Sequence, residues 1–513
     1  MQKLKLAALC ALLLGACSQQ TGDNPATETD AAEAAGESKT TAQETAANSE
    51  SEEASDDGPS LPSKNPYPST YEAYPSDTVL ITGATILTAA GDQIEGGSIL
   101  LQDGKIAAVG AGEDVTAPDG AVEIDAAGKW ITPGVIDIHS HLGDYPSPSM
   151  ASTSDGNEVT SPNTAHVWAE HSVWPQDAGF TRALAGGVTT LQILPGSANL
   201  FGGRSVVLKN VPSRTVQGMK FPGAPYGLKM ACGENPKRVY GEKGGPGTRM
   251  GNMAGYRSAW IEAAGYKKKW DDYETDYEEW AAKDDDDEDK GDAPDAPGRD
   301  LKLETLAGVL DGDIRVNMHC YRADEMVQVL DMAKEFDYQV TAFHHAIEAY
   351  KIADYLAEAG VCAAMWSDWW GFKLEAYDTV MENAALVHAQ PNSCAIIHSD
   401  SAIGVQRLNQ EAAKAMAAGR RAGIDVEPKD AIAWITAHPA KSMGILDQTG
   451  TLEAGKAADV VLWSGNPFSV YAKAEKVYID GALMYDRDDP ARSPRMDFEI
   501  GQKDNDFTGG AGQ

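Results

Sequence analysis

Positive charge is scarce in this chain of 513 residues. It has 42 Lys and Arg against 77 Asp and Glu, which gives a formal net charge of −35 at pH 7. Nucleic acid and anionic lipid surfaces would be repelled by such a chain, so neither is expected as a partner. Part of the negative charge is concentrated in the run KDDDDEDKGD around Asp284, which we interpret as a solvated loop.

Cysteine is also sparse, and its spacing is irregular. Beyond Cys10 and Cys17 the chain has four cysteines and no CxxC pair, which argues against a zinc–thiolate site. Their positions in or near predicted strands favour buried free thiols, although an oxidising compartment would permit a pair. The four are Cys232, Cys320, Cys362 and Cys394.

The N-terminal apolar run, from Leu6 to Ala16, is too short to span a bilayer as a mature helix. Lysines precede it, which is typical of an export signal. The run ends in Leu-Gly-Ala-Cys17, which resembles the lipobox of bacterial lipoproteins and implies acylation of Cys17. The alternative is an ordinary signal peptide with a chance cysteine. With Ser18 following, the lipobox interpretation predicts a lipid-anchored protein of the cell envelope, held in the outer membrane and facing the periplasm, after removal of the signal peptide in residues 1–17.

Large apolar residues are almost missing after the lipobox, up to about Pro62. A segment of Ala, Glu, Thr, Ser and Asp cannot bury enough surface to offset the entropy of ordering. We therefore predict a disordered acidic tether over residues 18–70. Residues 491–513 are expected to form a C-terminal tail.

Two distant segments share short β-rich runs broken by Gly-containing turns, Thr78–Gly110 and Thr449–Asp486. Gly-Asp, Asp-Gly and Gly-Gly pairs between alternating apolar residues are typical of hairpins. We predict one small composite β-sandwich from residues 76–132 and 446–490, with another domain inserted between its two parts.

Between these segments, over residues 133–445, apolar strand-like runs alternate with helical patterns, which is typical of a parallel α/β fold. Eight such runs predict a (β/α)8 TIM-type barrel. The predicted strands are WITPGVIDIHSH (130–141), GVTTLQILPG (187–196), TVQGMKF (215–221), YGLKMACGE (226–234), IRVNMHCY (314–321), QVTAFHHA (339–346), VCAAMWSD (361–368) and SCAIIHSD (393–400).

Polar residues recur at the C-terminal ends of these predicted strands, where barrel active sites are assembled. His139 and His141 are two residues apart at the end of the first strand, so both imidazoles face one side. His319, His345 and Asp400 end the fifth, sixth and eighth strands. Singly, each could be a hydrogen-bonded histidine or a helix-capping aspartate. Together they predict a metal site, since neutral imidazole and carboxylate suit zinc and related ions.

The chain resembles the amidohydrolase superfamily, specifically its imidazolonepropionase-like and metal-dependent dipeptidase-like members, from about Thr78 to about Asp486. The motifs are PGVIDIHSHLG, GVTT at Gly187–Thr190, the two later histidines, HSDS and TGTLEAGKAADVVLW. The resemblance implies attack by a metal-activated hydroxide, with Asp400 as metal ligand and proton shuttle. It implies that His139 and His141 bind one metal, that His319 and His345 bind a second, and that Asp400, His319 and His345 are the catalytic residues.

The fourth strand leaves the bridging ligand open. Many members of the family use a carboxylated lysine there, and Lys229 in YGLKMACGENPKR occupies that place in a strand too apolar for a free ammonium. The alternative ligand is Glu234. The simplest structural explanation is a Lys229 that pairs with an acid.

Loops after the predicted strands carry candidate substrate-binding residues: Asn199, Arg204, Arg238 and Arg322. An arginine here could bind a substrate carboxylate in a bidentate way, but a surface ion pair is the more common role. His398 shares the strand parity of Asp400, so we interpret it as packing behind the site. The remaining histidines are assigned no role: His166, His171, His344, His388 and His438.

The function predicted is a metal-dependent hydrolase that cleaves a C–N bond in an amide, a cyclic amide or a dipeptide. The alternatives are a mononuclear deaminase or imidazolone-type hydrolase, and a non-catalytic binding lipoprotein. One or two divalent ions are expected, with zinc favoured, and the partner is a small-molecule or peptide substrate. The oligomeric state stays open, a homo-oligomer included. The stretch from Tyr256 to Arg299 is expected to form a lid, an additional helical pair or a solvated insertion.

Overall fold

The structure is a computed structural model that describes residues 59–284, 287 and 289–492. Cys17, most of the predicted tether and nearly all of the predicted C-terminal tail lie outside the described residues. The described residues all fall within one compact unit. In these ranges, no helix combines the length and the apolar character that a membrane crossing requires.

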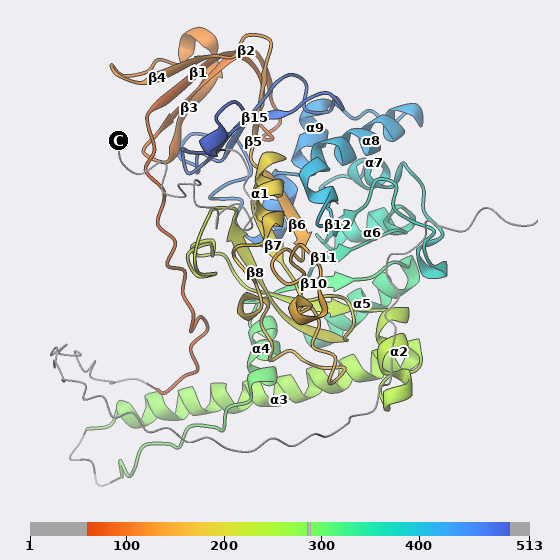
Figure 1. Cartoon of the computed structure of the whole chain (residues 1–513). Helices are drawn as coiled ribbons and strands as arrows, with labels where there is room; N and C mark the ends of the chain where they lie inside the picture. Colours follow the sequence, from red (N-terminus) through yellow and green to blue (C-terminus); the bar gives the residue numbers. More distant parts are fainter. Residues whose placement is uncertain (1–58, 285–286, 288, 493–513) are drawn as a thin grey trace, which may run out of the picture. The chain divides into compact units, whose positions relative to one another are not determined.

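A curled sheet forms the central part of the described chain (Figure 1). Its eight described strands follow one another in chain order, and all neighbouring pairs are parallel except those of β8, which runs antiparallel to β7 and β9. The strands are β6 (Val135–Ser140), β7 (Val188–Ile193), β8 (Phe201–Lys209), β9 (Gly227–Ala231), β10 (Arg315–His319), β11 (Val340–His344), β12 (Cys362–Met365) and β13 (Ala395–Ile397).

The two edge strands, β6 and β13, meet at their C-terminal ends. The Asp400 N–H donates to the His139 carbonyl oxygen over 3.0 Å. The Asp137 carboxylate accepts the Ser399 N–H over 3.1 Å and also the Ser399 hydroxyl. These bonds curl the sheet toward a barrel, and the mixed α/β class predicted from the sequence is confirmed.

The third strand differs from the prediction. Residues 215–221 form no strand; they make a turn in which Met219 and Lys220 both donate to the Val216 carbonyl oxygen. The third position belongs to β8, whose residues are all buried. The Gly-Gly-Arg segment near its start is typical of a loop. Hydrogen bonds to both neighbouring strands nevertheless hold it in the sheet.

Helices cover the outer side of the curled sheet (Figure 1). In α5, Asp324 and Glu325 occupy the first turn, where they complement the helix dipole, and the apolar face is buried. The helices are α1 (Ala178–Ala185), α2 (Glu234–Tyr240), α3 (Arg249–Ala281), α4 (Leu301–Leu310), α5 (Ala323–Phe336), α6 (Ala353–Glu358), α7 (Asn383–His388), α8 (Leu408–Arg421), α9 (Pro428–Ala433) and α10 (Ala437–Met443). Short 3-10 turns occur at η1 (Gly112–Asp114), η2 (Ala151–Thr153), η3 (Ala169–His171), η4 (Gly241–Lys243), η5 (Ala349–Ile352), η6 (Leu374–Ala376), η7 (Gly404–Arg407) and η8 (Pro490–Arg492).

The insertion predicted over residues 256–299 contains a long helix. The helix α3 has 33 residues and begins at Arg249, with the Thr248 hydroxyl accepting the Gly251 N–H as an N-cap. Tyr256, Trp260 and Ala263 are buried, and α3 packs against α4. Within the described part of residues 256–299 the structure has this single helix, and its partner α4 begins only at Leu301, beyond the predicted stretch.

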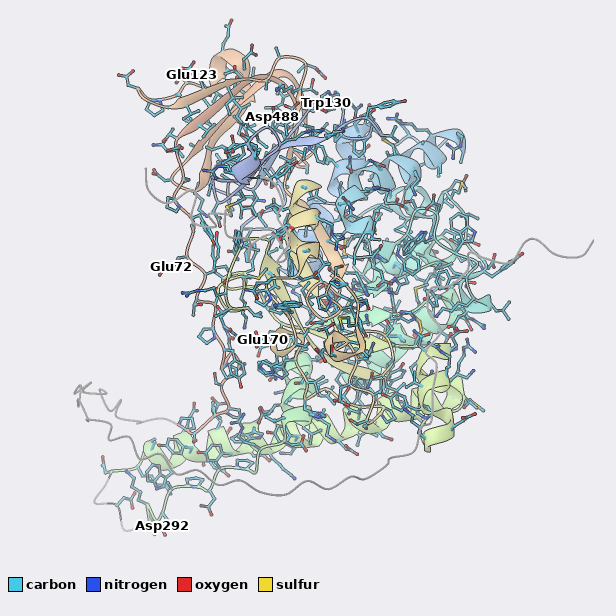
Figure 2. All side chains as sticks on the ribbon, in the orientation of Figure 1. Glu72, Glu123, Trp130, Glu170, Asp292 and Asp488 are labelled. Atoms are coloured by element: carbon cyan, nitrogen blue, oxygen red, sulfur yellow. A yellow bond between two sulfur atoms is a disulfide. The ribbon has the colours of Figure 1, made fainter. Side chains whose placement is uncertain are left out.

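A further sheet combines both ends of the described chain. β5 pairs with β1 on one side and with β14 on the other, so strands far apart in sequence become neighbours. Trp130, which Figure 2 labels, begins β5 and lies opposite Trp463 in β14. The sandwich architecture itself stays a prediction. The strands are β1 (Val79–Leu87), β2 (Gln93–Gln102), β3 (Lys105–Ala111), β4 (Val122–Asp125), β5 (Trp130–Pro133), β14 (Val460–Trp463), β15 (Ala474–Ile479) and β16 (Ala482–Asp486).

Two hairpins of this sheet confirm the Asp-Gly turns predicted from the sequence. Asp103 and Gly104 join β2 to β3 with φ values of 51° and 75°. Asp480 and Gly481 join β15 to β16 with φ values of 45° and 75°. Two successive positive φ values match the right-handed twist of the flanking strands, and Asp-Gly adopts them with little strain.

The first described residues run along the side of the barrel (Figure 1). The Ser69 hydroxyl donates to the Lys220 carbonyl oxygen over 2.6 Å, and the Tyr67 ring lies edge-on to the Trp168 ring with centroids 5.5 Å apart. The predicted tether boundary at residue 70 is therefore too late, because aromatic residues before it pack on the folded part.

Two disulfides replace the free thiols that we expected. Cys232 bonds to Cys320 just beyond the ends of β9 and β10, and Cys362 in β12 bonds to Cys394 before β13. Each joins neighbouring parallel strands of the barrel. The sequence could not show this pairing, because the partners are 88 and 32 residues apart and only the sheet register brings them together.

Replacing both Cys362 and Cys394 with alanine is expected to lower the free energy of unfolding by about 4 kcal/mol, because the unfolded chain loses a covalent loop. Denaturant unfolding followed by circular dichroism measures the loss. The single Cys362→Ala variant is the control and should lose a similar amount. An unchanged midpoint in the double variant would mean that this bond does not constrain the chain.

Candidate metal centre

Six predicted ligands come together at the C-terminal ends of the barrel strands. His139 lies in β6, Lys229 in β9 and His319 at the end of β10; the others lie in the loops directly after β6, β11 and β13. The His319 and His345 ring centroids are 4.9 Å apart, and those of His345 and His139 are 4.4 Å apart. The polar residues at the predicted strand ends therefore lie together in one cluster. Its members are His139, His141, Lys229, His319, His345 and Asp400.

The Asp400 carboxylate faces three imidazoles. Its oxygens lie 3.3 Å from His141 Nε2, 3.8 Å from His139 Nε2 and 3.7 Å from His345 Nε2. His139, His141 and Asp400 can each offer one ligand atom within 4.8 Å of the others. This spacing suits ligands arranged around one ion.

The hydrogen bonds of the first two histidines fix where their lone pairs point. The His141 Nδ1–H donates to the Leu194 carbonyl oxygen over 2.7 Å, so in the neutral ring Nε2 carries the lone pair. His139 Nδ1 lies 2.9 Å from His344 Nδ1, and His344 Nε2 lies 3.0 Å from the Asn317 Oδ1 acceptor. Because His344 Nε2 must donate to that oxygen, its Nδ1 accepts, and the His139 Nε2 lone pair is left facing Asp400.

Burial keeps His139, His319 and His345 neutral. The pKa values of His139, His319 and His345 fall well below the usual range, chiefly because burial penalises the charged imidazolium. Neutral nitrogen lone pairs facing a carboxylate repel one another unless a cation lies between them. The residues present therefore fit a divalent metal ion.

Buried nitrogens without partners give a second indication. His319 Nδ1, His345 Nδ1 and both ring nitrogens of His398 have no hydrogen-bond partner in the described part of the chain. Buried polar atoms are nearly always satisfied, so such a group of exceptions is typical of a functional site. His345 and Asp400 also have positive φ values, 58° and 49°, which residues other than glycine rarely adopt. Such backbone conformations are concentrated at functional sites.

Lys229 lies within the cluster and is fully buried. Its Nζ is 3.4 Å from His139 Nε2, and no carboxylate lies within ion-pair distance among the described residues. Burial lowers its pKa to about 7. The alternative that Lys229 pairs with an acid is therefore wrong among the described residues.

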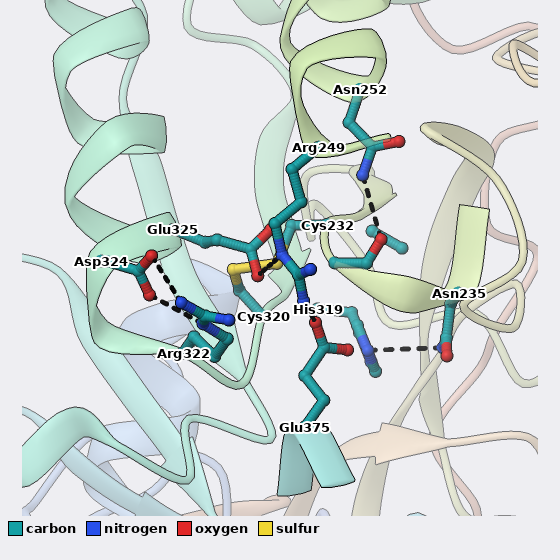
Figure 3. The surroundings of a disulfide bond; sticks show 12 residues. Cys232, Asn235, Arg249, Asn252, His319, Cys320, Arg322, Asp324, Glu325 and Glu375 are labelled. Atoms are coloured by element: carbon teal, nitrogen blue, oxygen red, sulfur yellow. Dashed lines mark hydrogen bonds and ion pairs between the residues drawn. A yellow bond between two sulfur atoms is a disulfide. The ribbon is translucent and has the colours of Figure 1, made fainter. Parts of the chain in front are cut away.

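Glu234, the alternative bridging ligand, begins α2 and pairs with a lysine instead of the histidines. Its carboxylate lies 3.4 Å from Lys373 Nζ, and its N–H donates to the Glu375 carboxylate. Figure 3 shows Glu375 between Arg249 and the His319 region, beside the Cys232–Cys320 disulfide.

Aromatic rings and one cation that the sequence did not indicate border the cluster. The Trp366 ring stacks on His345 with centroids 4.4 Å apart, and Tyr321 lies 4.6 Å from His319. Lys373 Nζ lies 4.5 Å from the Tyr321 ring centroid and donates to Asn235 Oδ1 over 2.9 Å. Trp366 directly follows β12, so its position at a strand end could have indicated that it borders the site. Lys373 comes from a loop with no sequence signal.

Two of the four predicted substrate-binding residues are engaged elsewhere. The Asn199 amide donates to the Glu158 and Ser161 carbonyl oxygens and so fixes a loop. Arg204 points out of the barrel toward α4, where its Nε donates to the Thr305 hydroxyl over 2.8 Å.

The other two lie at helices that begin after barrel strands. Arg322 precedes α5 and forms a bidentate ion pair with Asp324 at 2.9 Å, as Figure 3 shows. Arg238 lies on α2, within electrostatic range of Tyr321 and Lys373. Substrate binding by these two residues stays a prediction.

His398 and His344 have closer roles than the sequence suggested. His398 is buried with its ring centroid 4.7 Å from that of His345, which agrees with its predicted place behind Asp400. His344 was assigned no role, yet it orients His139. The positive φ of His345 breaks the strand alternation at this point, so His344 and His345 both contact His139, and the alternation rule could not have indicated a role for His344.

Comparison with known proteins gives extended similarity to one family. The model of the amidohydrolase family matches residues 130–484. Amidohydrolase tasK of Hapsidospora irregularis is 30% identical over 383 residues, which cover 72% of this chain and 38% of that protein. Imidazolonepropionase of Acidiphilium cryptum is 39% identical over 64 residues, which cover 12% of this chain and 16% of that protein. The chain thus matches well under two thirds of the length of these curated relatives.

A solved structure agrees over a longer range. The amidohydrolase from Thermotoga maritima MSB8 is 35% identical with a TM-score of 0.71, covering 80% of this chain and 100% of that chain. The family match includes the strands that carry the histidine and aspartate cluster. This chain belongs to the amidohydrolase family.

Proposed function

We propose that this protein is a metal-dependent hydrolase that cleaves the C–N bond of an amide, a cyclic amide or a dipeptide. The observation that carries the proposal is the cluster of imidazoles around the Asp400 carboxylate, with a buried Lys229 that has no acid partner among the described residues. Membership of the amidohydrolase family supports it.

The cluster can be divided between two ions. His139, His141 and Asp400 would hold one, and His319 and His345 would hold another, with Lys229 between them. We favour zinc, because imidazole and carboxylate ligands suit it. A bound ion would lower the pKa of water toward neutrality and polarise the substrate carbonyl.

The protein's own residues supply geometry and proton transfer. Asp400 would accept the proton of the attacking water on a carboxylate oxygen and deliver it to the leaving nitrogen. The backbone bond from Asp400 to His139 holds that carboxylate opposite the imidazoles. The stacked Trp366 ring shields His345 from solvent.

The state of Lys229 decides whether two ions can be bridged. With a pKa near 7, a substantial share of its side chain is the neutral amine at neutral pH. A neutral amine can attack carbon dioxide, forming an N–C bond and releasing a proton, and the resulting carbamate is a bridging ligand. We propose that Lys229 is carboxylated in this way.

The border of the cluster suits an apolar substrate with a carboxylate. Tyr321 and Trp366 provide aromatic surface, and the Lys373 ammonium lies beside the Tyr321 ring. A dipeptide can place an apolar side chain against these aromatic rings and its carboxylate beside the Lys373 ammonium. This combination favours the dipeptide among the three substrate classes.

Metal content tests the ligand set before any substrate is known. We expect two ions per chain by elemental analysis, falling toward one in Lys229→Ala, because the bridging ligand is lost. The exposed Lys243→Ala is the matched control and should keep both ions. One ion in the unmodified chain would favour a mononuclear deaminase or imidazolone-type hydrolase, and none after reconstitution would indicate a binding protein.

Asp400→Asn tests catalysis directly. We expect kcat to fall by about 100-fold or more, since the amide cannot take up the proton. The control is Asp368→Asn, which removes a carboxylate after β12 that pairs with Lys414 at 2.8 Å. Turnover of a dipeptide panel, with metal content measured in parallel, gives the comparison. If turnover is unchanged in Asp400→Asn, this cluster is not the catalytic site.

We also propose that the protein is lipid-anchored through Cys17 and faces the periplasm. The lipobox-like Leu-Gly-Ala-Cys sequence supports this, and the two disulfides suit an oxidising compartment.

Cell fractionation tests the anchor. The unmodified protein and the control Cys10→Ala are expected in the outer-membrane fraction. Cys17→Ala is expected to leave the membrane, because the acylated residue is lost. An unmodified protein found free of membranes would contradict the proposal.

A further inference from the structure

A pocket of about 640 Å³ lies outside the barrel wall, away from the histidine cluster. Its lining comes from the N-terminal segment, β8, α3 and α4, and includes Asn65, Arg204, Trp270 and Ala307. Gly203 pairs with Lys229 in the sheet, and Arg204 pairs with Leu228. Because successive strand residues face opposite sides, Arg204 faces outward while Lys229 faces the cluster.

Arg204 is a buried cation that forms no ion pair among the described residues. The residue is 5% exposed, and its guanidinium lies over the Trp168 ring at 4.0 Å. Its Nε bonds to Thr305. Among the described residues, its terminal nitrogens have no hydrogen-bond partner and no acid within ion-pair distance. Burial lowers its pKa to about 10. A buried charge of this kind is costly unless something neutralises it.

The acids near Arg204 are already engaged. Glu170, labelled in Figure 2, accepts from Lys220 over 2.9 Å and from the Tyr226 hydroxyl over 3.0 Å. Glu304 pairs with Arg299 at 2.7 Å. Neither of these carboxylates is within ion-pair distance of the guanidinium, so its terminal N–H groups remain available to a ligand.

The carboxylates at the pocket margin are also mostly paired. Asp313 lies 2.5 Å from Lys64, and Asp311 lies 2.9 Å from Lys267. The lining therefore has more acids than cations: the acids are Asp271, Glu274, Glu304, Asp311 and Asp313, and the cations are Lys64, Arg204 and Lys267. A multiply charged anion would be repelled by these acids, whereas one carboxylate can reach Arg204.

Asn65 adds a second donor to the pocket. Its Oδ1 accepts from Lys220 Nζ over 3.2 Å and lies 3.1 Å from the Tyr226 oxygen, whose one hydrogen is donated to Glu170. Because the bond with Lys220 fixes the carbonyl oxygen, the amide NH2 group is left to donate. The remaining wall includes the aromatic and apolar side chains of Tyr266, Trp270 and Ile314.

We propose that this pocket binds a small organic monocarboxylate with an apolar body, such as an aromatic acid or a single apolar amino acid. The carboxylate pairs with Arg204 and accepts from Asn65, and the apolar body packs against the aromatic wall. An ammonium group, where the ligand has one, faces the acidic margin. The site is separate from the metal centre and does not depend on the function proposed above.

Isothermal titration calorimetry of the full chain with phenylacetate tests the proposal. We expect saturable binding of one molecule per chain, weakened at least tenfold in Arg204→Met. The neutral isostere phenylacetamide should also bind at least tenfold more weakly, since it cannot form a charged pair. Arg257→Met is the matched control, because Arg257 pairs with Glu335 on the exposed side of α3 and should leave the affinity unchanged.

A second variant separates loss of the site from loss of the fold. Ala224→Trp places a large ring in the pocket lining while keeping Arg204, so it should abolish phenylacetate binding with unchanged circular dichroism. Equal phenylacetate affinity in the unmodified chain, Arg204→Met and Ala224→Trp would place binding elsewhere and overturn the proposal. Absence of binding to the unmodified chain would also overturn it.

Discussion

The bond between the Asp137 carboxylate and Ser399 is the constraint on which the site depends. It joins the middle of β6, the first strand of the curled sheet, to the residues just after β13, the last strand. The Asp400 N–H bonds to the His139 carbonyl oxygen one step further along. The contact between the two edge strands therefore also places Asp400 opposite the histidines.

Burial then determines the chemistry of the side chains gathered there. The buried imidazoles stay uncharged, and Lys229 is held close to its neutral form. Hydrogen bonds with Leu194, His344 and Asn317 fix which ring nitrogen faces inward. A group of imidazole nitrogens around one carboxylate suits a divalent ion.

Arg204 shows how strand geometry divides one short sequence between two sites. Gly203 lies beside Lys229 in the sheet, yet the next side chain leaves the barrel on the opposite side. There the guanidinium meets Trp168 and Thr305 instead of the substrate pocket predicted for it. A loop assignment for residues 199–204 could not reveal this, because only a strand imposes the alternation.

The sequence by itself located the strands of the curled sheet except the third, the Asp-Gly hairpins and the clustered residues at the strand ends, because periodicity and turn chemistry are local properties. It also placed His139 and His141 on one side. Only the tertiary structure decided the antiparallel β8, the pairing of Cys232 with Cys320, the orienting role of His344 and the outward direction of Arg204. These depend on register and on contacts between residues far apart in the chain, which no local pattern encodes.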